Sequence, residues 1–193
     1  MSSDFRPAGM EPLSPRRKWR AITIATLVLV PAFWSLMIGL VAAATDDKDA
    51  ADPSGMQAAG AIAFGISLIP FVFIALAFLS EHPRPPAAVV RAMALSVFVG
   101  LMVAAFFDPV TGVVAGTASG GIVALRMDTD HTVRSRILAV VVASVYTMLL
   151  VWTIGGLVLL PAPIFPFTAL GVADHLAERR ADAARADQAQ AQA

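Results

Sequence analysis

Residues 88–124 read AVVRAMALSVFVGLMVAAFFDPVTGVVAGTASGGIVA, an apolar stretch whose only charged side chains are those of Arg91 and Asp108. Small residues recur at every fourth position on both sides of Asp108. They are Ala92, Ser96, Gly100 and Ala104 on the first side, and Gly112, Gly116, Gly120 and Ala124 on the second. This spacing places each set on one face of an α-helix. The stretch therefore predicts two helices that each carry a narrow face of small side chains.

Asp108 and Pro109 predict the turn between these two helices, because proline lacks an N–H group and restricts the residue before it. If the chain reverses at Asp108, one antiparallel register aligns all the small residues. The resulting pairs are Ala104 with Gly112, Gly100 with Gly116, Ser96 with Gly120, and Ala92 with Ala124. In lipid no water drives apolar helices together, so close backbone contact along small residues takes over that role. We therefore expect these eight residues to pack a membrane hairpin.

The composition of the whole chain is that of a membrane protein. Of its 193 residues, 58% are hydrophobic and only 15% are charged, which is too apolar for a soluble domain of this size. A net charge of zero argues against a nucleic-acid partner. The absence of cysteine excludes disulfides and thiolate metal sites, and no cofactor is predicted. The predicted partners are the lipid bilayer and other membrane protein subunits, with any ligand left open.

Six apolar runs predict an all-α bundle of six transmembrane helices, arranged as three antiparallel hairpins within residues 21–177. Their expected bounds are 21–44, 55–79, 87–107, 109–125, 137–160 and 162–177. Residues 1–20 are expected to form a disordered cytoplasmic tail, and residues 178–193 a charged, alanine-rich cytoplasmic tail. The fourth run is shorter than a bilayer core, so either the membrane thins there or protein shields the helix. In the second run, Gly60, Gly65 and Pro70 indicate bending or close packing.

The distribution of basic residues predicts the orientation. With six crossings and the N-terminus inside, the cytoplasmic segments hold 13 lysine and arginine residues, and the outer loops hold only Lys48. This asymmetry is what the positive-inside rule requires. Five crossings would move Arg179, Arg180 and Arg185 outside, so the pattern favours six crossings. Alanine and arginine usage indicates a bacterial source, and hence a multi-pass protein of the cytoplasmic membrane.

All three histidines directly follow an acidic residue near the predicted cytoplasmic end of an apolar run. The residues of this predicted cytoplasmic-face polar cluster are Glu81, His82, Asp128, Asp130, His131, Asp174 and His175. If they converge, they can form a proton relay, a pH sensor or a hard-metal site. The alternative is that charged residues collect at the membrane interface and anchor helix ends. Because the spacing does not demonstrate convergence, no catalytic, cofactor or metal site is assigned.

The sequence favours a non-enzymatic scaffold or accessory subunit, because its apolar runs hold small-residue faces and, away from their ends, no Asp, Glu, Lys or Arg. Arg91 lies near the end of its run. Ion-coupled transporters usually carry such groups near the bilayer midplane. The alternative is a small-solute permease or the substrate-binding membrane component of a transporter. In size and helix count the chain is similar to the substrate-binding subunits of energy-coupling-factor vitamin transporters, with one Ala-x-x-x-Ala spacing at Ala21 and Ala25. A membrane enzyme acting on lipid-like substrates is a third hypothesis.

Overall fold

The computed structural model describes residues 13–45, 53–126 and 182–191, together with Val141, Val145, Leu149, Ile164, Phe167 and Arg179. These residues are helical or lie in turns, and the chain is an all-α protein. The four long helices are α1 (Pro15–Thr45), α2 (Pro53–Leu79), α3 (Pro85–Phe106) and α4 (Pro109–Ala124). A further helix covers residues 182–191. The predicted segments 137–160 and 162–177 lie largely outside the described residues.

Each of the four long helices begins at a proline, where the missing N–H group and the fixed φ angle suit the first helical turn. Asp108 caps α4, because its carboxylate accepts the Thr111 backbone N–H at 2.9 Å and also the Thr111 hydroxyl. This confirms the predicted turn at Asp108 and Pro109. α1 begins at Pro15, within the predicted polar tail rather than at Ala21, because Ser14 and Pro15 supply a helix start before the basic residues.

The helices α1 and α2 pack as an antiparallel pair with close backbone contact at two glycines. A β-carbon added to Gly65 would lie 2.7 Å from the Ala32 carbonyl oxygen, and one added to Gly39 would lie 2.8 Å from that of Ala58. Gly60, by contrast, has nothing within 4 Å of a β-carbon built on it. Close packing therefore explains Gly65, one of the two predicted positions, and not Gly60.

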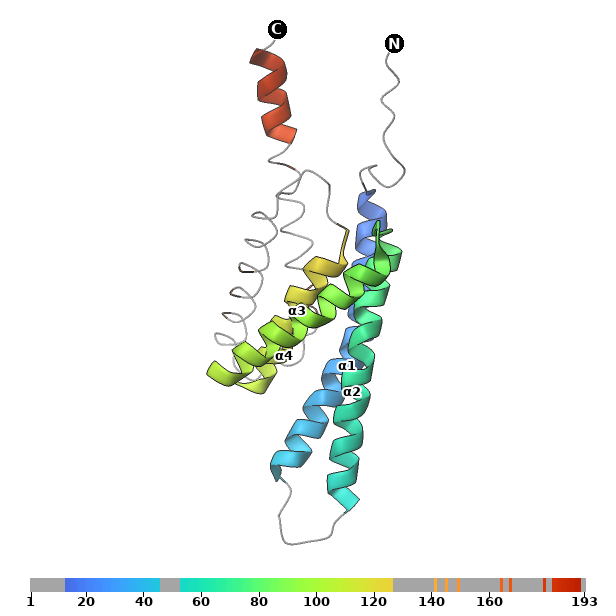
Figure 1. Ribbon diagram of the computed structural model, residues 1–193, viewed down its shortest axis with the longest axis vertical. Helices are drawn as coiled ribbons and strands as arrows, with labels where there is room; N and C mark the ends of the chain where they lie inside the picture. The colour runs from blue at the N-terminus through green and yellow to red at the C-terminus, as the bar shows by residue number, and fades with distance from the viewer. Residues whose placement is uncertain are drawn as a thin grey trace.

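The helices α3 and α4 form a second antiparallel pair, which crosses the α1–α2 pair obliquely (Figure 1). A β-carbon added to Gly112 would lie 2.6 Å from the carbonyl oxygen of Gly100. One added to Gly120 would lie 2.8 Å from that of Ala92, and Phe73 of α2 covers the same glycine. The two backbones therefore approach too closely at these glycines for any larger residue.

α4 is the central helix of the described structure. Twelve of its 16 residues are buried, including Thr117 and Ser119, whereas only Ala88, Ala92 and Ser96 are buried in α3. The fourth predicted run was too short to span a bilayer core unless the membrane thins or protein shields the helix. The burial of α4 fits shielding by protein. The main core cluster joins all four long helices with one later residue. Its members are Ile22, Ala25, Leu29, Val72, Phe73, Leu76, Ala92, Ile122, Ala124, Leu125 and Phe167.

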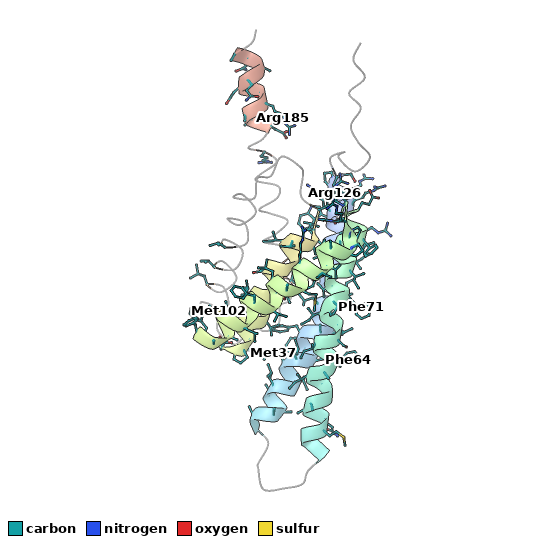
Figure 2. The ribbon with its side chains drawn as sticks, in the orientation of Figure 1. Met37, Phe64, Phe71, Met102, Arg126 and Arg185 are labelled. Atoms are coloured by element: carbon teal, nitrogen blue, oxygen red, sulfur yellow. The ribbon has the colours of Figure 1, made fainter. Side chains whose placement is uncertain are left out.

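The outer surface of the bundle is strongly apolar. On α3, Phe98 is 64% exposed, Leu101 67% and Phe106 75%, and on α2 Phe64 and Phe71 also point away from the neighbouring helix (Figure 2). In water such a surface would be unfavourable, whereas lipid tails solvate it. Among the described residues, α1, α2 and α3 are each long and apolar enough to cross a membrane, and α4 is a shorter apolar helix. The helices are therefore compatible with a membrane protein.

Candidate functional site: an apolar groove between two hairpins

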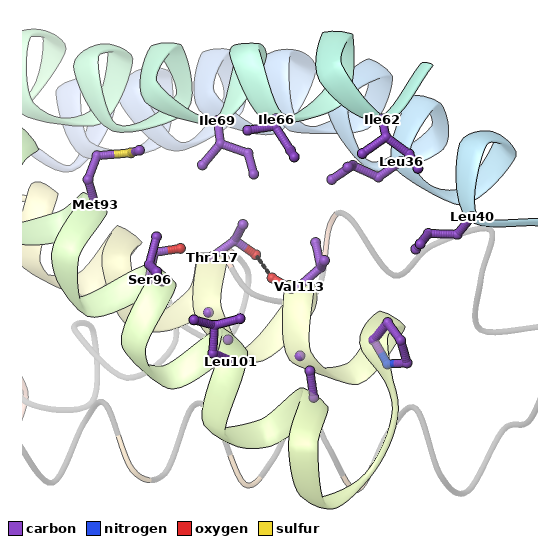
Figure 3. Close-up of a pocket in the computed structure, with 16 residues that line it drawn as sticks. Leu36, Leu40, Ile62, Ile66, Ile69, Met93, Ser96, Leu101, Val113 and Thr117 are labelled. Carbon is purple, nitrogen blue, oxygen red and sulfur yellow. Dashed lines mark hydrogen bonds between the residues drawn. The ribbon is translucent and has the colours of Figure 1, made fainter. Parts of the chain in front are cut away.

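A groove of about 380 Å³ opens between the α1–α2 pair and the α3–α4 pair. One wall carries Leu36 and Leu40 of α1 with Ile62, Ile66 and Ile69 of α2, and these side chains face α3 and α4 across the groove (Figure 3). The opposite wall includes Met93 and Leu101 of α3 and Val113 of α4. The volume lies in the range of ligand-binding pockets, which start near about 300 Å³.

The glycines of the α3–α4 seam also line the groove. Gly100, Gly112 and Gly116 contribute backbone where a larger residue would place a side chain. The lack of side chains at these positions lets α3 and α4 pack closely against each other. It also leaves the space beside the two helices open as part of the groove.

Only two side chains of the lining are polar. The Thr117 hydroxyl donates to the backbone oxygens of Val113, at 2.9 Å, and Val114, at 3.0 Å, so its own helix satisfies it. Ser96 is only 9% exposed and, within the described residues, its hydroxyl has no hydrogen-bond partner. A buried hydroxyl without a partner is unfavourable, so Ser96 is the point of the groove where a polar atom of an occupant would be stabilised.

Polar contacts gather at the opposite end of the helices, where α1 begins and where α2 and α4 end. The fully buried Ser80 hydroxyl accepts the Arg126 backbone N–H at 3.0 Å, which ties the end of α2 to the end of α4. Figure 2 shows Arg126 among the side chains at the start of α1. Glu81 forms an ion pair with Arg17 of α1. The hydrogen bond between Ser80 and Arg126 and the ion pair between Arg17 and Glu81 therefore both join distant segments at this end.

Of the predicted polar cluster, only Glu81 and His82 are described. Asp128, Asp130, His131, Asp174 and His175 lie outside the described residues, so their convergence stays a prediction. Glu81 is already paired with Arg17, and His82 Nδ1 accepts the Arg84 backbone N–H at 3.1 Å. Both side chains thus make contacts that secure the α2–α3 connection. Among the described residues no group of three metal-ligating side chains is present.

Two other sequence features lie inside the bundle. Ala21 and Ala25, which carry the Ala-x-x-x-Ala spacing, are both fully buried and pack within this chain. Ser119 in the GTASGG stretch (116–121) donates to the Ala115 carbonyl oxygen at 2.8 Å, a bond within its own helix. Both features therefore lie in the buried interior of the described structure.

Comparison with known protein families, with curated proteins and with solved structures finds no match to this chain. The groove itself could not be predicted from the sequence, because its walls are ordinary leucine, isoleucine and valine residues of separate helices. Ser96 was predicted only as a packing residue. Its four-residue spacing indicates a helix face, and nothing in the spacing shows that its hydroxyl lacks a partner.

Proposed function

We propose that this chain is a non-enzymatic scaffold or accessory subunit of the bacterial cytoplasmic membrane, and that its apolar groove seats a transmembrane segment of a partner protein. The observation that carries this proposal is the groove, whose lining holds no ionisable side chain and only two hydroxyl groups. A small polar solute or a hydrolytic reaction needs more polar groups than this lining supplies. A partner helix needs apolar contact and a hydrogen bond, which the lining and Ser96 offer.

The proposal includes six crossings with both termini inside. Its main support is the distribution of basic residues, with 13 in the proposed cytoplasmic segments and one outside. Val141, Val145 and Leu149 are helical, exposed and four residues apart, as expected for the lipid-facing side of a fifth crossing. Phe167 of the sixth segment is fully buried in the core cluster with α1, α2 and α4, which favours a sixth segment that enters the bundle.

The main alternative is a permease or substrate-binding component. It would be favoured by a polar cavity lined by Trp34, Tyr146 or Trp152. Trp34 does not line the groove and instead packs edge-on against Phe33, with ring centroids 5.9 Å apart. A membrane enzyme would need reactive groups at the cytoplasmic face, where the described acid, Glu81, is held by Arg17. The scaffold hypothesis therefore fits the described residues better than either alternative.

The test is copurification of the full chain in mild detergent, followed by mass spectrometry of the bound proteins and small molecules. Ile66→Trp fills the groove, because Ile66 lines it and is 54% exposed. Ile74→Trp is the matched control on the same helix, since Ile74 is exposed but does not line the groove.

We expect a stoichiometric membrane partner with the natural chain and with Ile74→Trp, and its loss with Ile66→Trp. Purification without a partner, or a partner that survives Ile66→Trp, contradicts the proposal. A bound small molecule that Ile66→Trp displaces would favour the transporter alternative instead.

A further inference from the structure

Arg91 is the only ionisable residue within α3, and it lies about 9 Å from the start of that helix at 1.5 Å per residue. Its side chain is exposed beside Val90, which is 68% exposed and apolar. Within the described residues Arg91 has no ion pair and no side-chain hydrogen bond. A cation on a lipid-facing surface is unfavourable unless it reaches an anion or water, and arginine reaches toward the interface through its long side chain.

Arg84 lies seven residues before Arg91, almost two helical turns away, so the two residues share one face at the start of α3. Its side chain is also exposed and makes no ion pair among the described residues. The backbone of Arg84 is fixed by its N–H bond to His82 Nδ1. Two exposed arginines therefore lie near one another at the start of α3.

Among the described residues, the neighbours of this pair are mostly cationic. The Arg17–Glu81 ion pair brings the first turn of α1 to the α2–α3 connection. Arg16 and Arg20 are exposed on that part of α1, one turn apart, and also make no ion pair within the described structure. Glu81, which lies at the α2–α3 connection, is already neutralised by Arg17. Trp19 is 48% exposed between these arginines, as is typical of an aromatic residue at a membrane interface.

We propose that Arg84 and Arg91 bind the phosphate of an anionic phospholipid headgroup, with Arg16 and Arg20 adding to the positive field at the same end of the bundle. The guanidinium group suits this partner, because it binds phosphate oxygens through two parallel N–H bonds. The lipid's acyl chains then lie along the exposed apolar surface of α3, beside Val90 and Phe98. This site is separate from the groove, and neither proposal depends on the other.

The test uses the full chain in vesicles that contain phosphatidylcholine and phosphatidylglycerol in equal amounts, extracted gently and analysed by native mass spectrometry. The measured quantity is the ratio of the two lipids that remain bound. We expect phosphatidylglycerol to be favoured by at least about fivefold, the effect of roughly one basic residue near a membrane surface. The preference should weaken as the salt concentration rises, because salt screens the exposed arginines.

Arg84→Gln combined with Arg91→Gln should remove most of this preference. Arg84→Lys combined with Arg91→Lys keeps the charges and should retain part of it. The control is Arg179→Gln with Arg185→Gln, which removes the same charge from the tail, where Arg185 already pairs with Asp182, and should leave the preference unchanged.

Equal retention of both lipids by the natural chain overturns the proposal, whatever the variants do. So does a preference that survives Arg84→Gln and Arg91→Gln, or one that the tail variant removes equally. If inorganic phosphate displaces phosphatidylglycerol completely at low concentration, the site binds free phosphate rather than a lipid headgroup, and the proposal is also overturned.

Discussion

Gly116 packs against Gly100 so closely that a β-carbon added to Gly116 would lie 3.1 Å from the Gly100 Cα. The same added atom would lie 2.5 Å from the Ser96 carbonyl oxygen, a separation that real β-carbons do not show. Because the nearest atoms belong to the backbone, α3 and α4 would have to move apart to admit even a methyl group. Gly100 and Gly116 therefore mark a very close contact between the backbones of α3 and α4, and both residues also line the groove.

Gly116→Ala should therefore lower the free energy of unfolding by about 1–3 kcal/mol, the usual cost of overpacking. The measurement is unfolding of the purified full chain in mixed micelles by titration with a denaturing detergent. Gly60→Ala is the matched control, because nothing lies within 4 Å of the added atom. It should raise stability by about 0.5–1 kcal/mol, the helix preference of alanine over glycine. Equal effects of the two substitutions would contradict the close-packing account.

Ser80→Ala should destabilise the bundle, because the buried Arg126 N–H loses its acceptor. The expected cost is about 1–3 kcal/mol, the penalty for a buried polar group without a partner. Ser67→Ala provides the comparison on the same helix. Its exposed hydroxyl bonds only to the Phe64 carbonyl oxygen one turn earlier, so the change should stay within about 0.5 kcal/mol. A harmless Ser80→Ala would mean that the ends of α2 and α4 are not held together through this bond.

Glu81 ends α2 with a φ of 54°, the left-handed conformation that favours glycine. The His82 N–H bonds to the Ala77 oxygen at 2.9 Å and the Glu81 N–H to the Phe78 oxygen at 3.2 Å, which together close the helix end as a Schellman motif. Glu81→Gly should therefore be more stable than Glu81→Ala by about 1 kcal/mol, because both remove the ion pair and only glycine removes the strain.

Arg17→Gln tests the ion pair separately. Both side chains of the pair are more than half exposed, at 59% and 54%, so we expect a loss of at most about 1 kcal/mol. If Glu81→Ala were as stable as Glu81→Gly, backbone strain at this position would be refuted.

The sequence predicted the α3–α4 hairpin well, because the four-residue spacing of small residues and the turn at Asp108 and Pro109 are local patterns. Small residues at every fourth position on both sides of Asp108 and Pro109 leave one antiparallel register. The structure places Gly112 against Ala104 and Gly116 against Gly100, as in the predicted pairs, whereas Gly120 meets Ala92 in place of its predicted partner Ser96. The helical class followed from long apolar runs, and the α4 cap followed from the residue types at its start. These features depend on residues that are close in sequence.

Features that join distant segments were not predictable. Ser80 and Arg126 are 46 residues apart, and Arg17 and Glu81 are 64 apart, so no local pattern links them. The groove depends on how two hairpins cross, which the composition of each helix leaves open. The same reason limited the polar cluster, because adjacent acidic and histidine residues reveal neither what each side chain meets nor whether three such pairs converge.

The central claim is that six crossings place both termini on the cytoplasmic side of the membrane, and reporter fusions test it most directly. Fusions after Asp49, Arg134 and Arg185 should report outside, inside and inside, respectively. A reporter that reads inside after Asp49, or on the same side after Asp49 and Arg134, contradicts the hairpin arrangement. A reporter that reads outside after Arg185 would remove the sixth crossing, and the account of the bundle would be wrong.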